Sequence, residues 1–141
     1  MTQSVVSIGY ERRSVADLVQ ILAAQGVVKL IDVRELPISR RPGFSKVPLA
    51  TSLEAAGIEY VHLGVAGNPH RKEKHDIDLC LLLYADHLSQ HPGILDRVAR
   101  EISDGLTAVL CYERNHHECH RSILLEALVS RGHEADVIAV E

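Results

Sequence analysis

No apolar run in the 141-residue sequence approaches the roughly 18 residues that a membrane-spanning helix needs. The chain also has no internal repeat, no low-complexity tract and no linker rich in Gly and Ser. Its opening, Met-Thr-Gln-Ser-Val-Val-Ser, lacks the basic start and the apolar stretch of a secretory signal. We therefore expect one domain over residues 1–141, located in the cytoplasm and without a membrane partner.

Cysteine is scarce, and its number is odd. Three cysteines in a chain without a secretory signal argue against a framework of structural disulfides. Cys80, Cys111 and Cys119 are therefore predicted to be reduced thiols. Hydrophobic residues make up 46% of the chain, which is enough for a core that needs neither disulfides nor a structural metal.

Positive charge is in deficit. Fifteen Lys and Arg stand against nineteen Asp and Glu, which gives a formal net charge of -4. This balance argues against a protein that coats nucleic acid over its whole surface, although it leaves room for local basic patches.

Short β-rich runs alternate with longer stretches of helical spacing. Most of the β-rich runs are continuously apolar, which is typical of strands buried on both faces of a parallel sheet. Five strands are predicted, at residues 4–8, 28–33, 58–63, 107–112 and 135–140. The alternation predicts an α/β fold with three layers, a mainly parallel sheet with helices on both faces. The order of the strands and the oligomeric state stay open.

The predicted helices carry clear end signals. Ser14 and Asp17 have the spacing of a capping box, and Gly26 can end the helix that they start. Pro48 is predicted to lie in the first turn of a second helix, which stops at Gly57. Three further helices are predicted at residues 76–90, 92–103 and 119–131.

Two long segments without a helix or strand pattern, 35–47 and 64–75, follow predicted strands. Loops of this length are uncommon in a compact domain unless they carry function. In a parallel sheet both loops emerge at the carboxyl edge, where open α/β folds bind their ligands. We expect the functional site at that edge.

The first candidate cluster follows the second predicted strand. Asp32 and Arg34 alternate onto the same face of that strand, so the carboxylate can orient the guanidinium. Ser39 and Arg40 follow, in a segment 34–46 that holds four basic residues and one acidic residue. Because forked Arg donors match a phosphate, Arg34, Ser39 and Arg40 are predicted to bind an anion. The alternative is a solvated basic loop with a structural Asp-Arg pair.

The second candidate cluster is the segment 111–121, Cys-Tyr-Glu-Arg-Asn-His-His-Glu-Cys-His-Arg, which runs from the end of a strand into a helix. Unpaired amides and the positive end of the helix dipole favour an anion and a thiolate at such a start. Arg121 would add a charged donor there and help to bind the anion. Glu113 and His120 are predicted to move protons as general acid or base.

Three interpretations of this segment remain open. Cys111, Cys119 and His120 are potential ligands of a divalent metal such as zinc or iron, although their spacing matches no common zinc pattern. Cys119 could instead be a nucleophilic thiolate, although the spacing from Cys111 to Arg121 differs from the tighter Cys-to-Arg cradle of thiol phosphatases. In the third interpretation Cys111 packs in the core, and the polar side chains only hold the loop in place.

Three residues outside these clusters are also considered: His62 and Tyr10, which each have two interpretations, and Cys80, which has one. His62, near the end of the third predicted strand, would point into the same crevice as Asp32 if their strands are neighbours, or it is a partly buried histidine with satisfied hydrogen bonds. Tyr10, just after the first strand, could reach the crevice or cap the sheet. Cys80 lies among leucines and is predicted to belong to the core.

Four motifs resemble the family catalogued as domain of unknown function 488, over nearly the whole chain. They are Ile8-Gly-Tyr10 with Arg13-Ser14; Asp32-Val-Arg-Glu-Leu-Pro37 with Ser39-Arg40 and Gly43-Phe44-Ser45; Gly57-Ile-Glu-Tyr-Val-His62-Leu63; and Cys111-Tyr-Glu113 with Cys119-His120-Arg121. The Cys-x-Glu and Cys-His-Arg pair is the signature of the family. The resemblance implies a small intracellular α/β protein whose signature residues gather at one edge of the sheet, and it implies no reaction.

The sequence departs from the pattern of that family at two places. The stretch between Leu63 and Asp76 is shorter than usual, which could open the crevice or remove a lid. His116 and His117 stand where Asp-Pro is common, and the histidine pair could add metal affinity.

The leading functional hypothesis is an enzyme, a hydrolase or transferase, that acts on a phosphate-bearing substrate such as a nucleotide or nucleic acid. Arg34, Arg40 and Arg121 would hold the anion, and Asp32 would orient Arg34. One alternative is a thiol or metal site built on Cys111, Cys119 and His120. The other is a non-catalytic module that binds nucleic acid or a protein.

Overall fold

The computed structural model describes residues 3–73, 75–102, 105–132 and 135–141. Within these residues the chain forms one five-stranded sheet in the order β3-β2-β4-β1-β5, and every strand pairing is parallel. This confirms the predicted α/β fold. The strands are β1 (Gln3–Gly9), β2 (Val27–Asp32), β3 (Glu59–His62), β4 (Leu106–Cys111) and β5 (Ala135–Val140).

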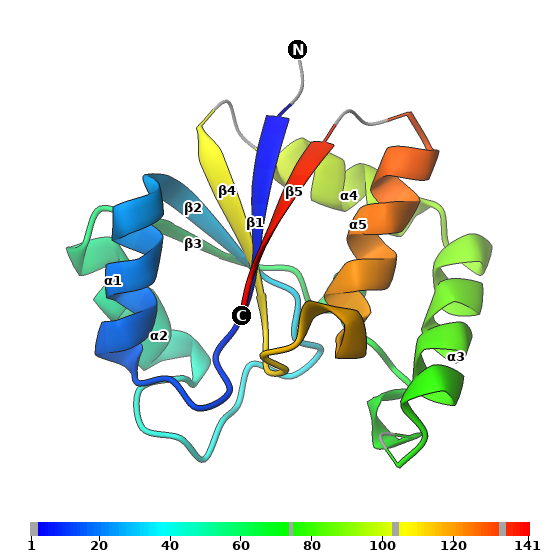
Figure 1. The fold of residues 1–141 in the computed structure, drawn as a ribbon, viewed down its shortest axis with the longest axis horizontal. Helices are drawn as coiled ribbons and strands as arrows, with labels where there is room; N and C mark the ends of the chain where they lie inside the picture. Colours follow the sequence, from blue (N-terminus) through cyan, green and yellow to red (C-terminus); the bar gives the residue numbers. More distant parts are fainter. Residues whose placement is uncertain (1–2, 74, 103–104, 133–134) are drawn as a thin grey trace.

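Helices cover both faces of the sheet. Figure 1 shows α1 and α2 on one side and α3, α4 and α5 on the other, so the three predicted layers are confirmed. The α-helices are α1 (Val15–Gln25), α2 (Lys46–Ala55), α3 (Ile77–Gln90), α4 (Gly93–Glu101) and α5 (His120–Ser130). Three short 3₁₀ helices complete the described chain: η1 (Gly64–Ala66), η2 (Arg71–Glu73) and η3 (His116–Glu118).

The predicted caps of α1 are present. The Ser14 hydroxyl accepts a hydrogen bond from the amide of Asp17, and the Asp17 carboxylate accepts one from the amide of Ser14. Gly26 ends the helix in the left-handed conformation, with a φ of 79°. A residue with a Cβ is strained there, which is why glycine marks the end of the helix.

Several helix boundaries differ from the prediction. Helix α2 begins at Lys46 and ends at Ala55, so Pro48 lies in its first turn as predicted, where the amides have no intrahelical acceptor, and the helix stops two residues before Gly57. Helix α4 spans 93–101 rather than 92–103, of which 103 lies outside the described residues. Helix α5 begins one residue later than predicted, after η3. The segment 64–75 is not a plain loop, since η1 and η2 lie within it.

The core has one layer on each face of the sheet. Alternate strand residues point to opposite faces, so Val5 packs towards α3, α4 and α5 while Val6 packs towards α1 and α2. Both are fully buried. The continuously apolar strand pattern therefore has the predicted cause, burial on both faces. No α-helix of the described residues is long and apolar enough to cross a membrane.

The strand order brings three carboxyl ends together at the middle of the sheet. Strand β4 lies between β1 and β2, with Gly9 in register with Cys111 and Asp32 in register with Leu110. The chains continue so closely past this edge that a Cβ on Gly9 would overlap the carbonyl of Glu113. The segments after β1, β2 and β4 thus meet at one place, which is where an α/β fold places its site.

Candidate functional site

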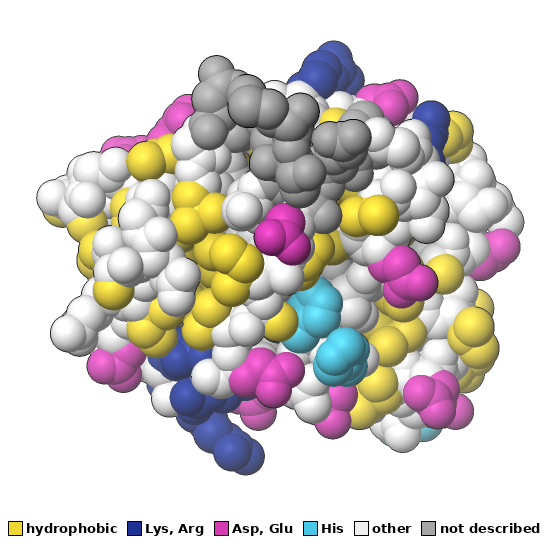
Figure 2. All heavy atoms as spheres, turned by 45° about the horizontal axis from the view of Figure 1, so that its top comes forward, with side chains coloured by type: hydrophobic (Ala, Val, Ile, Leu, Met, Phe, Trp, Pro, Cys, Tyr) yellow, Lys and Arg dark blue, Asp and Glu magenta, His cyan; other side chains and the backbone are white. Residues whose placement is uncertain are grey.

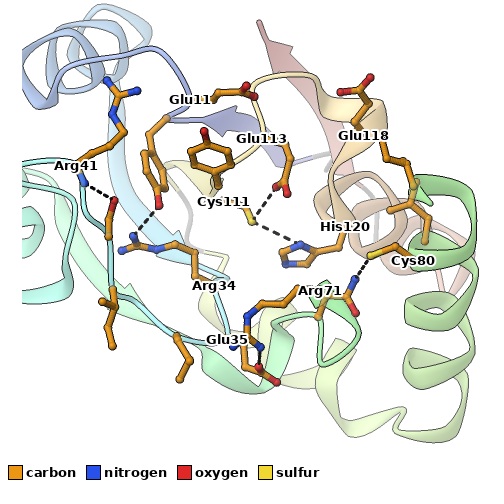
Figure 3. Close-up of a pocket in the computed structure, with 18 of the residues that line it drawn as sticks. Glu11, Arg34, Glu35, Arg41, Arg71, Cys80, Cys111, Glu113, Glu118 and His120 are labelled. Atoms are coloured by element: carbon orange, nitrogen blue, oxygen red, sulfur yellow. Dashed lines mark hydrogen bonds and ion pairs between the residues drawn. The ribbon is translucent and has the colours of Figure 1, made fainter. Parts of the chain in front are cut away.

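A pocket of about 610 Å³ lies at this central carboxyl edge, within the range of small-molecule sites. Segments after β1, β2 and β4 supply three of its walls, and the start of α3 supplies another. Figure 3 shows side chains from these segments directed towards a common space. The pocket is lined by Tyr10, Glu11, Arg34, Glu35, Leu36, Ile38, Ser39, Arg40, Arg41, Asn68, Arg71, Ile77, Cys80, Leu81, Cys111, Tyr112, Glu113, Glu118 and His120.

At the inner end of the pocket two cysteines and one histidine meet. The Nδ1 atom of His120 lies 3.5 Å from Sγ of Cys111 and 3.7 Å from Sγ of Cys119. Within the part of the chain that the structure describes, these three residues are the group whose potential metal-ligand atoms all lie within 4.8 Å of one another. All three are buried, and Cys111 and His120 reach the pocket while Cys119 lies behind them.

The ring of His120 is held in one orientation from its far side. Its Nε2 atom lies 3.0 Å from the backbone oxygen of Val33. A carbonyl oxygen only accepts hydrogen bonds, so Nε2 carries a proton, and Nδ1 is the ring nitrogen that faces the two sulfurs. Metal-binding histidines are fixed by this kind of contact.

Charged neighbours set the ionisation of the two thiols. Burial opposes ionisation of Cys119, but the hydrogen bond from Cys111 and the nearby cations of His120 and Arg121 hold the pKa of Cys119 well below its usual value. The hydrogen bond to Cys119 and burial raise the pKa of Cys111. Burial disfavours the charged form of His120, and the negative sulfur of Cys119 outweighs it and raises the pKa of His120. The favoured state has its negative charge on Cys119.

Glu113 lies beside this cluster on the pocket wall. The thiol of Cys111 donates to Oε2 of Glu113 at 3.5 Å, as the dashed line in Figure 3 marks. The carboxylate of Glu113 does not belong to the group of close potential ligands. It therefore has the position of a proton acceptor next to the cluster rather than that of a fourth ligand.

Asp32 orients Arg34, as the alternation along β2 predicts. The carboxylate of Asp32, which is fully buried, accepts from Nε of Arg34 at 2.9 Å and from Nη2 at 2.7 Å. It also accepts from the hydroxyl of Tyr60 at 2.5 Å. Nη1 of Arg34 donates to the carbonyl of Phe44 at 2.7 Å and to the hydroxyl of Tyr10 at 3.4 Å. Most donors of Arg34 are thus used within the protein, and its charge is compensated.

The basic wall of the pocket belongs to the segment after β2. Ser39 accepts a hydrogen bond from the amide of Arg41, and Arg41 donates to the carbonyl of Arg13. Arg40 is exposed and has no hydrogen bond or ion pair with any residue that the structure describes. Arg71, from η2, forms an ion pair with Glu35, and Figure 3 shows the two side chains next to each other at one side of the pocket.

The structure brings most of the predicted site residues to the pocket. Arg34, Ser39, Arg40, Cys111, Glu113 and His120 line it, and Cys119 touches His120 from behind. Besides Cys119, three predicted site residues do not line it: Asp32, His62 and Arg121.

These three side chains have partners within the protein. His62 donates from Nε2 to the backbone oxygen of Arg34 at 2.8 Å, so it holds the backbone after β2 rather than facing the crevice. Arg121 is completely buried and donates to Cys119 and to the carbonyl of Glu113. His116 and His117 do not join the metal-ligand group, and Nδ1 of His116 lies 2.6 Å from the hydroxyl of Ser7.

Several pocket residues did not follow from sequence reasoning. Glu11 belongs to the loop after β1, Glu118 belongs to η3, and Ile77 and Leu81 belong to the first turns of α3. Cys80 is buried as predicted, yet it also lines the pocket and accepts a hydrogen bond from Asn68 at 3.2 Å. The sequence signal that pointed to this region was the long segment 64–75, which precedes α3. It predicted a functional loop, but it did not predict that α3 itself lines the pocket.

Comparison with known proteins places the chain in a family. The family described as Domain of unknown function DUF488 matches residues 14–128. The chain belongs to this family. No match was found among curated proteins or among solved structures. The DUF488 match includes the segments that supply Arg34, Cys111 and His120 to the pocket.

Proposed function

We propose that the protein is an enzyme that binds a transition metal, zinc in the first place, through Cys111, Cys119 and His120. One observation carries the proposal: the two sulfurs lie 3.5 and 3.7 Å from Nδ1 of His120. A tetrahedral zinc ion has Zn–S bonds of about 2.3 Å and Zn–N bonds of about 2.0 Å, so it holds sulfur and nitrogen ligands roughly 3.6 Å apart. The spacing already fits the metal.

The surroundings of the three ligands support the same proposal. The hydrogen bond from His120 to Val33 leaves Nδ1 free to bind, and Nε of Arg121 donates to Sγ of Cys119 at 3.1 Å, which stabilises a thiolate. Three protein ligands leave a fourth position of a tetrahedral metal open. Because Cys111 and His120 line the pocket, a substrate in the pocket can reach that position.

The proposed reaction is hydrolytic. A metal with an open position polarises water for attack on a substrate. Glu113 lies beside Cys111, within hydrogen-bond reach of the cluster, and can take the proton of that water and give it to the leaving group. Arg34 and the segment after β2 shape the opposite wall.

We infer further that the substrate carries a phosphate group. Ser39, Arg40 and Arg41 line the pocket on the side away from the cysteines, and Arg40 has no ion pair with any described residue. An uncompensated guanidinium at a pocket wall matches an anion of the substrate. Arg34 is compensated by Asp32, so its contribution to anion binding is smaller than the sequence alone predicts.

The metal content of the purified protein tests the proposal. Protein prepared without a His tag and supplied with zinc is expected to hold one zinc ion per chain by elemental analysis, and its cobalt form to show thiolate-to-metal absorption bands. Cys111→Ser, Cys119→Ser and His120→Ala are each expected to lose the metal. Cys80→Ser is the matched control, because Cys80 lines the same pocket outside the cluster.

Three results would contradict the proposal. One is wild-type protein that holds no stoichiometric zinc or cobalt. Another is Cys80→Ser losing the metal together with the cluster variants. The last is Glu113→Gln losing the metal, since that would make Glu113 a ligand and close the fourth position.

A further inference from the structure

The outer half of the pocket combines exposed apolar side chains with the guanidinium of Arg40. Leu36 and Ile38 are 53% and 73% exposed, and Ile77 and Tyr112 are 41% and 38% exposed. All four line the pocket. Exposed apolar side chains that gather at one pocket mark a surface for an apolar part of a ligand. The arrangement fits a flat apolar body beside Tyr112, with an anion near Arg40.

Other guanidiniums of the pocket are already paired. Arg34 forms its ion pair with Asp32, and Arg71 forms one with Glu35. Arg41 donates to the carbonyl of Arg13, and its guanidinium lies 5.8 Å from the ring of Phe44. Arg40 is therefore the pocket guanidinium that the described residues leave without a hydrogen bond or ion pair. A single terminal phosphate suits this balance better than a long polyanion.

The reaction is expected at the end of the pocket that holds Cys111 and His120. Figure 3 shows Arg41 on one side of the pocket and Cys111 and His120 on the other. Thiolate and imidazole ligands suit zinc, whereas phosphoryl transfer typically uses oxygen-ligated ions, often in pairs. The phosphate is therefore a handle for binding, and the reaction takes place at the other end of the ligand.

Building on the proposed metal centre, we propose that the substrate is a free nucleotide whose base carries an amino group, and that the enzyme removes this group hydrolytically. A zinc ion with two Cys and one His ligand, beside a Glu that is not a ligand, is the combination that performs this reaction on nucleobases. Glu113 stands in that relation to Cys111, Cys119 and His120. A pocket of about 610 Å³ has room for a base, a sugar and one phosphate.

The reaction balances without an oxidant or a second substrate. Water adds to the ring carbon that bears the amino group, so a carbon–oxygen bond forms. Glu113 moves a proton from the water to the nitrogen, the carbon–nitrogen bond breaks, and ammonia leaves. The products are the oxo base, still on its sugar phosphate, and ammonia.

A free nucleotide is favoured over a nucleic-acid strand. The formal net charge is -4, and Figure 2, whose view brings the amino ends of the strands forward, shows acidic side chains spread over the side turned away from the pocket. At the pocket itself, Arg34, Arg41 and Arg71 already have partners within the protein. A strand needs a basic track for several phosphates. Arg40 offers a contact for one phosphate only.

The test uses the full chain loaded with zinc, and it measures binding and ammonia separately. In calorimetry CMP or AMP is expected to bind about tenfold or more tightly than cytidine or adenosine, because a charged hydrogen bond to the phosphate is gained. Arg40→Ala is expected to abolish this preference. Arg97→Ala is the matched control, since Arg97 is exposed on α4 and does not line the pocket.

Ammonia release completes the test. CMP or AMP is expected to yield one ammonia per oxo nucleotide formed, and Glu113→Gln is expected to bind the nucleotide and hold zinc but release none. Zinc-loaded protein that binds neither nucleotide, or binds without releasing ammonia, overturns this inference and leaves the metal centre standing. Release from a single-stranded oligonucleotide alone overturns the assignment of a free nucleotide. Protein without stoichiometric zinc overturns the proposed function itself.

Discussion

Nε of Arg121 donates a hydrogen bond to Sγ of Cys119 at 3.1 Å, and the whole Arg121 side chain is buried. Its other described partner is the carbonyl of Glu113, and it forms no ion pair with a carboxylate among the described residues. A buried cation without an anion is costly. Arg121 and a negatively charged Cys119 therefore stabilise each other, which gives a role to an arginine that does not reach the pocket.

Replacing Arg121 is expected to cost the fold more than replacing an exposed arginine. Arg121→Met leaves the sulfur of Cys119 without its charged donor, and we expect a loss of about 3 kcal/mol or more in unfolding free energy. Arg131→Met removes two exposed contacts, the ion pair with Asp96 and the hydrogen bond to the carbonyl of Pro92, and a loss of about 1 kcal/mol or less is expected. Urea denaturation of both variants checks this. Equal and small losses would show that Arg121 is not paired with a charge.

At the end of β2, replacing Asp32 is expected to lower the unfolding free energy more than replacing its partner Tyr60. Asp32→Ala leaves the buried guanidinium of Arg34 uncompensated, and a loss of about 3–5 kcal/mol in unfolding free energy is expected. Tyr60→Phe removes one neutral donor to the same carboxylate, and about 1–3 kcal/mol is expected. Denaturation curves give both values. A milder effect for Asp32→Ala than for Tyr60→Phe would contradict the assigned network.

Tyr60 gives the same network a pH dependence. Burial, and then the hydrogen bond to Asp32, raise the pKa of the Tyr60 phenol above its ordinary value of 10.0. A raised pKa in the folded state means that the stabilisation is complete below about pH 10 and is lost as pH rises towards the folded pKa. Absorbance titration of the phenols checks this by difference from Tyr60→Phe. Ionisation of Tyr60 at its ordinary pKa would contradict it.

The sequence predicts the layers and the edge of the site because both depend on local patterns. Continuously apolar runs indicate buried parallel strands, and Ser14, Asp17 and Gly26 mark the ends of α1 by chemistry within a few residues. The strand order β3-β2-β4-β1-β5 does not follow from such patterns, since it depends on which runs pair over long distances.

The partners of individual side chains were harder to predict for the same reason. Cys111, Cys119 and His120 lie close in sequence, and the structure brings them together. Arg121 follows them directly, yet its helix turns it into the core, where it contacts Cys119. His62 lies in register with Asp32 as a neighbouring strand would place it, but its ring closes on the backbone of Arg34. Rotamer and burial, rather than position in sequence, decide these contacts.

Gly9 links the fold to the candidate site, and its replacement makes a further prediction. A Cβ at this position would overlap the backbone carbonyl and carbon of Glu113, and neither can move without displacing the end of β4. Gly9→Ala is therefore expected to lower the unfolding free energy by about 2 kcal/mol or more and to weaken metal binding.

Gly93 provides the control for that prediction. A Cβ there meets no atom within 4 Å, and Gly93 lies at the start of α4 and does not line the pocket. Gly93→Ala is expected to leave metal binding unchanged and to raise stability by about 0.5 kcal/mol, since alanine loses less backbone entropy. Thermal unfolding and zinc content of the two variants compare them directly. If Gly9→Ala kept wild-type stability and zinc, the close approach of β1 to Glu113 would not be what positions the carboxylate beside Cys111.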